Sequence, residues 1–395
     1  MTRKMNSRER MLCTLNHREP DRVPIDLGAT QVSSIHVSAH RALCEHLGID
    51  PEPVVMADIV QQVVTPCDAL LDRLEIDTRG LFPGCSHNRG FEDTQDKGDC
   101  YEHVDEWDFT QRIKKDGGFW WSQVGAPLDG MEVDPDALAA YRWPNAADPT
   151  RLAGLRQQAE AYRRQGKIVV CKGLAAGMLE MGQRIRGMSN FLCDLLADPK
   201  TAETILDRVL ELKKQFWAML LDEIGDLVDI VAEADDYGTQ QSQLISLDTF
   251  KSLMEPRLRE LIGFIKQKHA QRRPADEPGF VFFHSCGNVR PYLPDFIDMG
   301  IDILNPVHIS ASGMEPEALK KEYGRDIVFW GGGGETQHVL PTGTPDEVRR
   351  DVRRNVEALM PGGGYVFGTV HNIQAEVPPE NLMAMWEAFR EAGVY

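Results

Sequence analysis

The sequence predicts an α/β protein of the (β/α)8 TIM barrel class. From about residue 165 onward, short apolar segments alternate with longer segments of helical periodicity in unbroken order. Strands that are each followed by a helix usually pair in parallel through right-handed crossovers. Two earlier strand-like segments, Arg22–Leu27 and Val54–Ala57, would supply the two strands needed to close a barrel. A barrel is therefore favoured over an open doubly wound sheet.

The repeating units can be placed in order along the chain. The expected strands are apolar runs at 167–171, 229–232, 280–283, 302–305, 327–330 and 365–370. The expected helices have the spacing of an apolar helix face, at 190–224, 246–269, 289–298, 315–323, 345–359 and 379–391. Residues 85–130 interrupt this order and are rich in glycine, aspartate and aromatic residues, which predicts an antiparallel excursion over the barrel mouth. No low-complexity linker or repeat divides the chain, so residues 1–395 are expected to form a single domain.

Composition limits the partners of this chain. Its formal net charge of −18 disfavours nucleic acid or an anionic membrane as the main partner. The first residues lack the apolar core of a signal peptide, and the sequence has no apolar run of about 18 residues. Eight cysteines without C-x-x-C spacing are typical of reduced thiols rather than of a disulfide framework. These features predict a cytoplasmic protein.

A histidine and a cysteine stand two residues apart where one expected strand ends. His284 and Cys286 follow the run Phe280–Phe283, and side chains at i and i+2 of a strand point the same way. Imidazole and thiolate together suit Zn²⁺, and His371, after another expected strand, is a candidate third ligand. Three ligands with an open fourth position are typical of a catalytic metal. The alternative is a packed cysteine beside a surface histidine.

Other polar residues follow the expected strands, where TIM barrels place their chemistry. Glu233 is a candidate fourth ligand that yields to substrate, and Asp236 is a candidate base, ligand-orienting group or helix cap. Gly332 lies in a four-glycine run in which the backbone could approach a phosphate or a ring, or simply turn. The remaining strand-end residues are Asp26, Lys172, Asp235, Asn305, His308, Glu335 and Asn372.

With these residues placed, the chain resembles the uroporphyrinogen decarboxylase superfamily, and within it the branch of zinc-dependent, corrinoid-linked methyltransferases. The resemblance is carried by segments spread over nearly the whole chain: Ser7–Arg10, His17–Pro24, Glu233–Gln240, His284–Asn288, His371–Gln374 and Pro378–Asn381. It implies a distorted (β/α)8 barrel with zinc at its mouth, held by the H-x-C pair that His284 and Cys286 match. Relatives that methylate thiols use a second cysteine where this chain has His371.

Two departures from the family pattern bear on substrate. A site with two imidazoles and one thiolate makes zinc a stronger Lewis acid and makes a bound thiol less nucleophilic than two thiolates would. The porphyrinogen-binding relatives carry an arginine-rich loop, but the matching segment Ile25–Val32 has no arginine. The resemblance therefore favours methyl transfer over decarboxylation of a polyanion.

The functional hypothesis is a zinc-dependent methyltransferase that moves a methyl group between a corrinoid and a small thiol or methoxylated substrate. His284, Cys286 and His371 would hold zinc, Glu233 and Asp236 would act in catalysis, and Asp26, Asn305 and Gly332 would contact the cofactor. The chain lacks the D-x-H-x-x-G pattern of corrinoid-binding modules, so cobalamin would arrive free or on a partner corrinoid protein. A homodimer is expected by family analogy. The alternatives are a metal-free lyase of the decarboxylase type and a non-catalytic binding protein.

Overall fold

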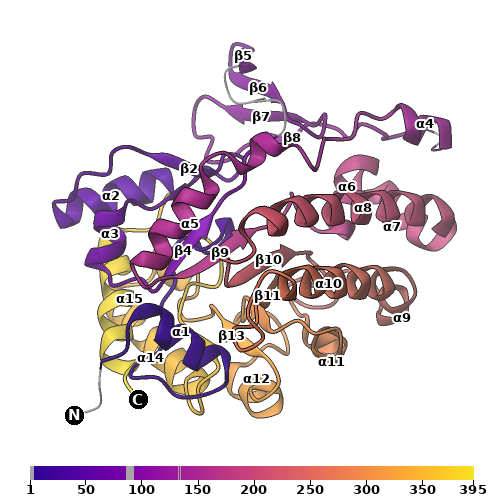
Figure 1. Ribbon diagram of the computed structural model, residues 1–395. Helices are drawn as coiled ribbons and strands as arrows, with labels where there is room; N and C mark the ends of the chain where they lie inside the picture. Colours follow the sequence, from indigo (N-terminus) through magenta and orange to yellow (C-terminus); the bar gives the residue numbers. More distant parts are fainter. Residues whose placement is uncertain (1–3, 86–92, 132, 134) are drawn as a thin grey trace.

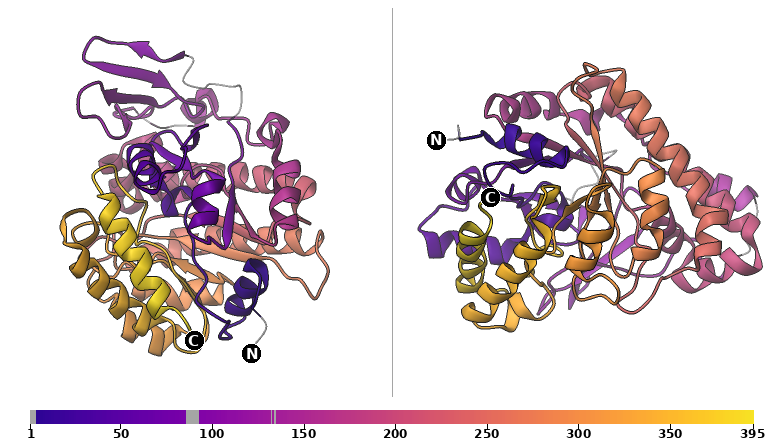
Figure 2. Two further views of the ribbon diagram at one scale, coloured as in Figure 1. Left: turned by 90° about the vertical axis from the view of Figure 1, so that its left-hand side faces the viewer. Right: turned by 90° about the horizontal axis from the view of Figure 1, so that it is seen from below.

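A curled parallel sheet lies at the centre of the computed structural model, which describes residues 4–85, 93–131, 133 and 135–395. Helices surround the sheet (Figures 1 and 2). Its seven strands have the order β14-β13-β12-β11-β10-β9-β4. They are β4 (Thr78–Leu81), β9 (Ile168–Lys172), β10 (Ile230–Ala234), β11 (Phe280–His284), β12 (Ile303–Asn305), β13 (Val328–Trp330) and β14 (Tyr365–Val366). The six strands expected from residue 165 onward are all in this sheet.

An extended segment at residues 24–26 connects the two edges of this sheet. The amide of Asp26 donates to Phe367 O at 2.9 Å, and the amide of Phe367 donates to Pro24 O at 2.8 Å, just beyond β14. On the other side, the amide of Asp77 donates to Ile25 O at 3.0 Å, just before β4. The segment predicted at Arg22–Leu27 therefore bridges both edge strands, and the fold is TIM-barrel-like.

The prediction for Val54–Ala57 is wrong. That segment belongs to β2 (Val55–Asp58), in a separate antiparallel sheet with β1 (Ile35–His36) and β3 (Val63–Thr65). Its place in the parallel sheet is taken by β4, whose sequence Thr-Arg-Gly-Leu has no apolar run to identify it. A Cβ at Gly80 would lie 2.7 Å from the carbonyl oxygens of Gly28 and Ala29, so the backbone approach here requires glycine.

The helices follow the expected order, with two interruptions. The segment 190–224 is divided between α7 and α8 at Asp198–Pro199, and 246–269 contains a π-helical turn at Phe250–Met254. Among the described residues, none of the helices is both long and apolar enough to cross a membrane. The helices are α1 (Ser7–Leu15), α2 (Val37–Leu47), α3 (Asp68–Arg73), α4 (Pro135–Ala140), α5 (Leu155–Arg164), α6 (Met178–Arg186), α7 (Met188–Ala197), α8 (Pro199–Ile224), α9 (Leu247–Thr249), α10 (Glu255–Ala270), α11 (Leu293–Asp298), α12 (Pro316–Tyr323), α13 (Val339–Thr342), α14 (Pro345–Leu359) and α15 (Pro379–Ala392).

A four-stranded antiparallel sheet stands apart from the parallel strands, at the top of Figure 1. Its strands are β5 (Gln95–Asp96), β6 (Cys100–Val104), β7 (Thr110–Lys114) and β8 (Ser122–Gln123). Just before β8, the amide of Trp121 donates to Val60 O at 2.8 Å, which ties this sheet to the turn after β2. Part of the segment predicted as an excursion, residues 86–92, lies outside the described residues.

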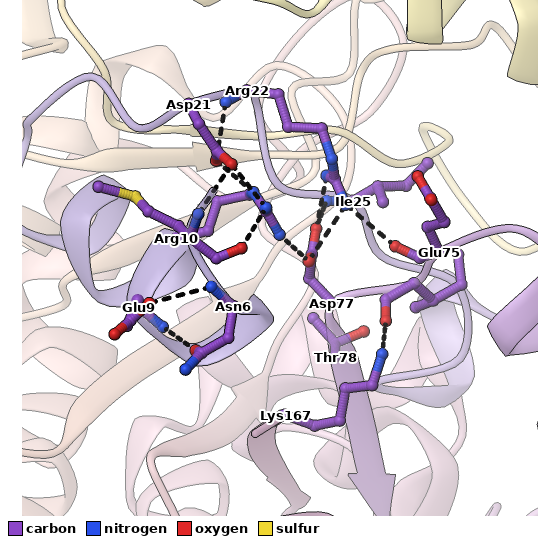
Figure 3. A network of polar contacts seen from close by, with 12 residues as sticks. Asn6, Glu9, Arg10, Asp21, Arg22, Ile25, Glu75, Asp77, Thr78 and Lys167 are labelled. Carbon is purple, nitrogen blue, oxygen red and sulfur yellow. Dashed lines mark hydrogen bonds and ion pairs between the residues drawn. The ribbon is translucent and has the colours of Figure 1, made fainter. Parts of the chain in front are cut away.

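Helix α1 covers the amino-terminal end of the parallel strands. Its buried Met11 and Leu15 belong to the same apolar cluster as the inward-facing side chains of the sheet, such as Phe282. The guanidinium of Arg10, 3% exposed, lies 2.7 Å from the carboxylate of Asp77, which also accepts from Arg22 at 2.7 Å. Figure 3 shows how this network joins α1 to the start of β4. The amino-terminal end of the sheet is therefore closed by paired charges.

Three aspartates repeat one arrangement along this end of the sheet. Each aspartate lies just before a strand and forms two hydrogen bonds with one residue of the neighbouring extended segment. The backbone amide of the aspartate donates to the carbonyl of that residue, and the aspartate carboxylate accepts the amide of the same residue. Asp77 is paired in this way with Ile25, Asp229 with Val169, and Asp302 with Val281. The carboxylate–amide distances are 2.9, 3.0 and 2.7 Å. Each pair acts as an added rung of the ladder that fixes the register of two neighbouring strands.

At the opposite end, a buried aspartate anchors α6. The carboxylate of Asp235, one residue beyond β10, accepts the amides of Leu179 and Glu180 at 2.8 and 3.0 Å. A carboxylate at this position satisfies orphan amides in the first turn of a helix. Burial raises the pKa of Asp235 to about 7. Gly177, the residue before α6, has no room for a side chain, because a Cβ would overlap Asp235 and the carbonyl of Ala234.

We predict that Gly177→Ala lowers the free energy of unfolding by about 1–3 kcal/mol, the usual cost of overpacking. Gly263→Ala is the matched control, because its Cβ would meet nothing within 4 Å on α10. It should raise stability by about 0.5–1 kcal/mol through helix propensity. Chemical denaturation of both variants measures this, and equal stabilities would contradict the close contact at Gly177.

Candidate metal centre

His284, Cys286 and His371 meet at the carboxyl ends of the strands. His284 is the last residue of β11, Cys286 follows two residues later, and His371 lies in the loop after β14. The Nε2 atom of His284 is 3.4 Å from Sγ of Cys286, and the two imidazole centroids are 5.4 Å apart. One ligand atom from each residue lies within 4.8 Å of the others. Strands β12 and β13 separate β11 from β14, so the curl of the sheet brings these side chains together.

A buried amide fixes the tautomer of His284. Asn305, paired with His284 across β11 and β12, places its Oδ1 atom 2.6 Å from Nδ1 of the imidazole. The Nδ2 of Asn305 donates to Trp330 O at 3.0 Å, which identifies its Oδ1 as the acceptor. The proton of a neutral His284 is therefore on Nδ1, and Nε2 presents its lone pair to Cys286. Such a partner on the far nitrogen is typical of a metal-ligating histidine.

His371 is held in the same manner by its neighbour. Its Nδ1 lies 2.9 Å from Oδ1 of Asn372, while Nδ2 of Asn372 donates to Gln61 at 2.6 Å. The amide thus accepts from His371 as well, and leaves Nε2 of that imidazole unprotonated. Burial, and then the nearby His284, lower the pKa of His371 to about 4. A neutral imidazole at physiological pH is the form that binds a metal ion.

Cys286 and Asp236 are joined at the edge of this cluster. The Oδ1 atom of Asp236 accepts the Cys286 amide at 2.8 Å and lies 3.8 Å from Nε2 of His284. Burial, followed by the Asp236 charge, raises the pKa of the Cys286 thiol well above its usual value. The thiol therefore retains its proton unless a cation is close. The Asp236 side chain is 44% exposed, so it can also meet a ligand from solvent.

The separation of His284 and Cys286 matches one edge of a tetrahedral zinc site. Zinc bonds of about 2.3 Å to sulfur and about 2.0 Å to nitrogen give a tetrahedral S···N edge of about 3.5 Å. The observed edge between Cys286 and His284 is 3.4 Å. The two imidazoles each keep Nε2 free, and the three donors leave a fourth position for another group.

Glu233 is not brought to this cluster. Its neighbour Ala232 belongs to the apolar cluster inside the curled sheet, so Glu233 points the other way, toward α8. There its carboxylate accepts from Lys213 at 2.7 Å and from Trp217 at 2.5 Å, and it is 3% exposed. The predicted ligand and catalytic role of Glu233 is therefore wrong, since strand alternation directs it to a buried ion pair.

The three residues predicted to contact a cofactor have internal partners instead. Asp26, 5% exposed, accepts from Thr78 and Trp330 at 2.6 and 2.9 Å. Asn305 serves His284, as described above. Gly332 has a φ of +77° and packs where a Cβ would lie 2.7 Å from Val307 O. These residues shape the barrel mouth, and the close approach expected of the glycine run is to neighbouring backbone.

Asn372 and His308 have roles in the site that were not expected from the sequence. Asn372 was only noted as a strand-end residue, although an amide directly after a candidate ligand histidine was the available signal. His308 accepts the Gly287 amide on Nδ1 at 2.9 Å, so a neutral ring has its proton on Nε2. That Nε2 is buried and makes no close hydrogen bond among the described residues, and the Gln337 side chain is its polar neighbour. His308 is therefore a donor held beside the H-x-C turn.

Two other strand-end residues are occupied by contacts within the protein. Lys172, the last residue of β9, forms an ion pair with Asp58 at 3.1 Å. Glu335 accepts the amides of Gln337, His338 and Val339 and thereby caps the short helix α13. Both residues therefore have structural partners at the barrel mouth.

Comparison with known proteins places the chain in a family. The family model for uroporphyrinogen decarboxylase (URO-D) matches residues 166–392, so the chain belongs to this family. A uroporphyrinogen decarboxylase of Chlorobium phaeobacteroides is 23% identical over 200 residues, which are 50% of this chain and 51% of the relative. The chain thus matches about half the length of that relative. The predicted resemblance is confirmed at the level of the family.

A solved structure extends the likeness in fold to nearly the whole chain. A methyltransferase from Methanosarcina mazei superposes with a TM-score of 0.62, covering 98% of this chain and 99% of its own. The two sequences are 19% identical, so this likeness concerns the fold.

We predict that Asn305→Ala weakens zinc binding by about 10- to 100-fold, because His284 loses the acceptor that fixes its tautomer. Zinc titration against a competing chelator measures the affinity, and ring ¹⁵N shifts report the tautomer. Asn16→Ala, which removes an amide from the exposed end of α1, is the control and should change neither. An Asn305→Ala protein with unchanged affinity and tautomer would refute the positioning role.

Proposed function

We propose that this protein is a zinc-dependent methyltransferase that moves a methyl group between a corrinoid and a small thiol or methoxylated substrate. The observation that carries the proposal is the convergence of two imidazole Nε2 atoms and one thiol at the barrel mouth of a URO-D family member. When bound, zinc would serve as a Lewis acid for the oxygen or sulfur of the reacting group. The donor set favours this role, because a single thiolate ligand leaves the ion more electrophilic than two.

The residues of this chain have separate tasks in the proposed reaction. Asn305 and Asn372 would orient the imidazoles toward the ion. Asp236, partly exposed beside Cys286, would accept the proton of an incoming thiol or hydrogen-bond the substrate. The buried Nε2–H of His308 would donate to a substrate oxygen.

The bond changes balance without a further redox partner. In the thiol direction, a methylcorrinoid would supply the methyl group to the substrate sulfur and would keep the electron pair of the broken carbon–cobalt bond. In the ether direction, the reduced corrinoid would take the methyl group, and the electron pair of the broken carbon–oxygen bond would leave on the substrate oxygen. The chain supports the second direction better, because a stronger Lewis acid stabilises the departing oxygen. The corrinoid would be free or carried by a separate protein.

Further parts of the hypothesis remain proposals with the same basis. We propose that residues 1–395 form one domain and that the segment at residues 24–26 completes a distorted (β/α)8 barrel. The cytoplasmic location and the homodimer expected from the sequence remain predictions. An assay for methyl transfer between methylcobalamin and a panel of thiols and methoxylated aromatic compounds identifies the direction.

A metal-free decarboxylase is the second candidate, because the family model and the Chlorobium relative both bear that name. It predicts full activity in the presence of chelator and tolerance of Cys286→Ser. The methyltransferase proposal predicts loss of activity in both conditions.

We predict that Cys286→Ala and His371→Ala each lose about one zinc per chain relative to wild type, because either change leaves two protein ligands. Elemental analysis of the purified proteins measures the metal. Chelation of the wild-type protein should abolish methyl transfer, and added zinc should restore it. Unchanged zinc content in both variants would contradict the assigned ligands.

We predict that Asp236→Asn retains zinc but lowers kcat for methyl transfer by about 10²- to 10⁴-fold, the usual contribution of a proton acceptor. The amide can still accept from the Cys286 backbone, so the loop should keep its shape. Glu233→Gln is the matched control. This variant should lower Tm, because Lys213 keeps a buried and unpaired charge. It should leave kcat unchanged. A larger loss of kcat in Glu233→Gln than in Asp236→Asn would reverse the assignment.

A further inference from the structure

A second group of soft donor atoms lies outside the barrel mouth, between α2 and the start of α3. His40 and Cys44 are four residues apart on α2 and so share one face of the helix. Cys67 is the N-cap residue of α3, the helix drawn beside α2 in Figure 1. One ligand atom of each residue lies within 4.8 Å of the others. None of the three contributes to the barrel-mouth cluster.

The separations match the edges of a tetrahedral zinc site. Nε2 of His40 is 3.6 Å from Sγ of Cys44, and the Sγ atoms of Cys44 and Cys67 are 4.0 Å apart. Ordinary zinc bond lengths give about 3.5 Å for an N···S edge and about 3.8 Å for an S···S edge. Both observed edges are therefore within a few tenths of an ångström of the geometry an ion would require.

The hydrogen bonding of His40 is incomplete although its side chain is buried. The residue is 1% exposed and Cys44 is 0% exposed. Nε2 of His40 accepts only a long bond from the Cys67 amide, at 3.3 Å, and faces the Cys44 thiol. In the described part of the chain, Nδ1 has no hydrogen-bond partner. Nε2 therefore faces both cysteines, and an ion bound there would displace one long hydrogen bond.

We propose that His40, Cys44 and Cys67 form a second metal site, selective for a soft divalent ion such as zinc. The ion would join α2 to the start of α3. Its two cysteine ligands, Cys44 and Cys67, are separated by 23 positions in the sequence. The donor set has two thiolates and one imidazole, which suits zinc rather than calcium or magnesium. A link of this kind stabilises the fold, and it does not depend on the proposed methyl transfer.

The test uses full-length protein that carries Cys286→Ser and His371→Ala, so that the barrel-mouth cluster is disabled. This background protein should still bind about one zinc per chain. With Co²⁺ in place of zinc, it should show the near-ultraviolet thiolate-to-cobalt absorption of a tetrahedral site with two thiolates. Adding Cys44→Ser should abolish both signals. Cys193→Ser, which changes an exposed cysteine on α7, is the matched control and should alter neither.

The outcomes separate this site from the proposed function. A background protein that binds no zinc and shows no cobalt spectrum, while wild type binds zinc, overturns the second site alone. If wild type binds one zinc and the background protein binds the same amount, the barrel-mouth centre alone is overturned. Two missing thiols in a titration of the metal-free protein under native conditions, restored by reductant, would identify a Cys44–Cys67 disulfide and overturn the metal site.

A second variant keeps the test decisive if buried Cys44 cannot be replaced. Cys67 is only partly buried, so Cys67→Ser should fold and should lose the cobalt absorption. Zinc should also raise the Tm of the background protein but not that of the same protein with Cys67→Ser. An equal rise in both proteins would contradict the site.

Discussion

The whole architecture depends on reciprocal pairing between three aspartates and the strands that precede them. Asp77, Asp229 and Asp302 each add a side-chain rung to the ladder, and Asp77 also neutralises Arg10 and Arg22 beneath the sheet. A slip of one residue would turn every side chain of a strand to the opposite face. Because Asp302 fixes β12 against β11, Asn305 arrives beside His284 at the other end of the same pair of strands. The chemistry at the mouth therefore depends on charges placed at the base.

The two ends of the sheet differ in the kind of polar partners that their buried groups have. At the base, buried charges are fully paired, as expected where desolvation would make a lone ion costly. At the mouth, neutral amides replace charged partners, and each histidine keeps one nitrogen without a proton. Even the buried Asp235 is used for structure, since it caps α6 with its carboxylate. Asp236 keeps a carboxylate near the ligand atoms and partly open to solvent.

The sequence predicted most of the sheet and the convergence of the three candidate ligands, for reasons that can be traced to particular residues. Apolar strands such as Phe280–Phe283 can be recognised from their composition. His284, Cys286 and His371 could be placed together because parallel strands end at one edge of the sheet. The strand Thr78–Leu81 could not be found, since its pairing is set by tertiary neighbours and by the lack of a side chain at Gly80. Glu233 was misplaced because it was expected to follow the strand, whereas β10 continues through Ala234 and strand alternation turns its side chain toward α8. Asn305 was assigned to a cofactor and not to His284, because their contact depends on the register between β11 and β12.

The amide-held imidazoles have a consequence for the order of events during biosynthesis. A zinc finger must capture its ion in order to fold, because its ligands are scattered until the ion gathers them. Here the hydrogen bonds that His284 and His371 donate to Asn305 and Asn372 hold both rings in place through contacts within the protein. Under the proposed function, newly made chains would form the barrel mouth before the ion binds, and the supply of zinc would then control how much of the protein becomes active.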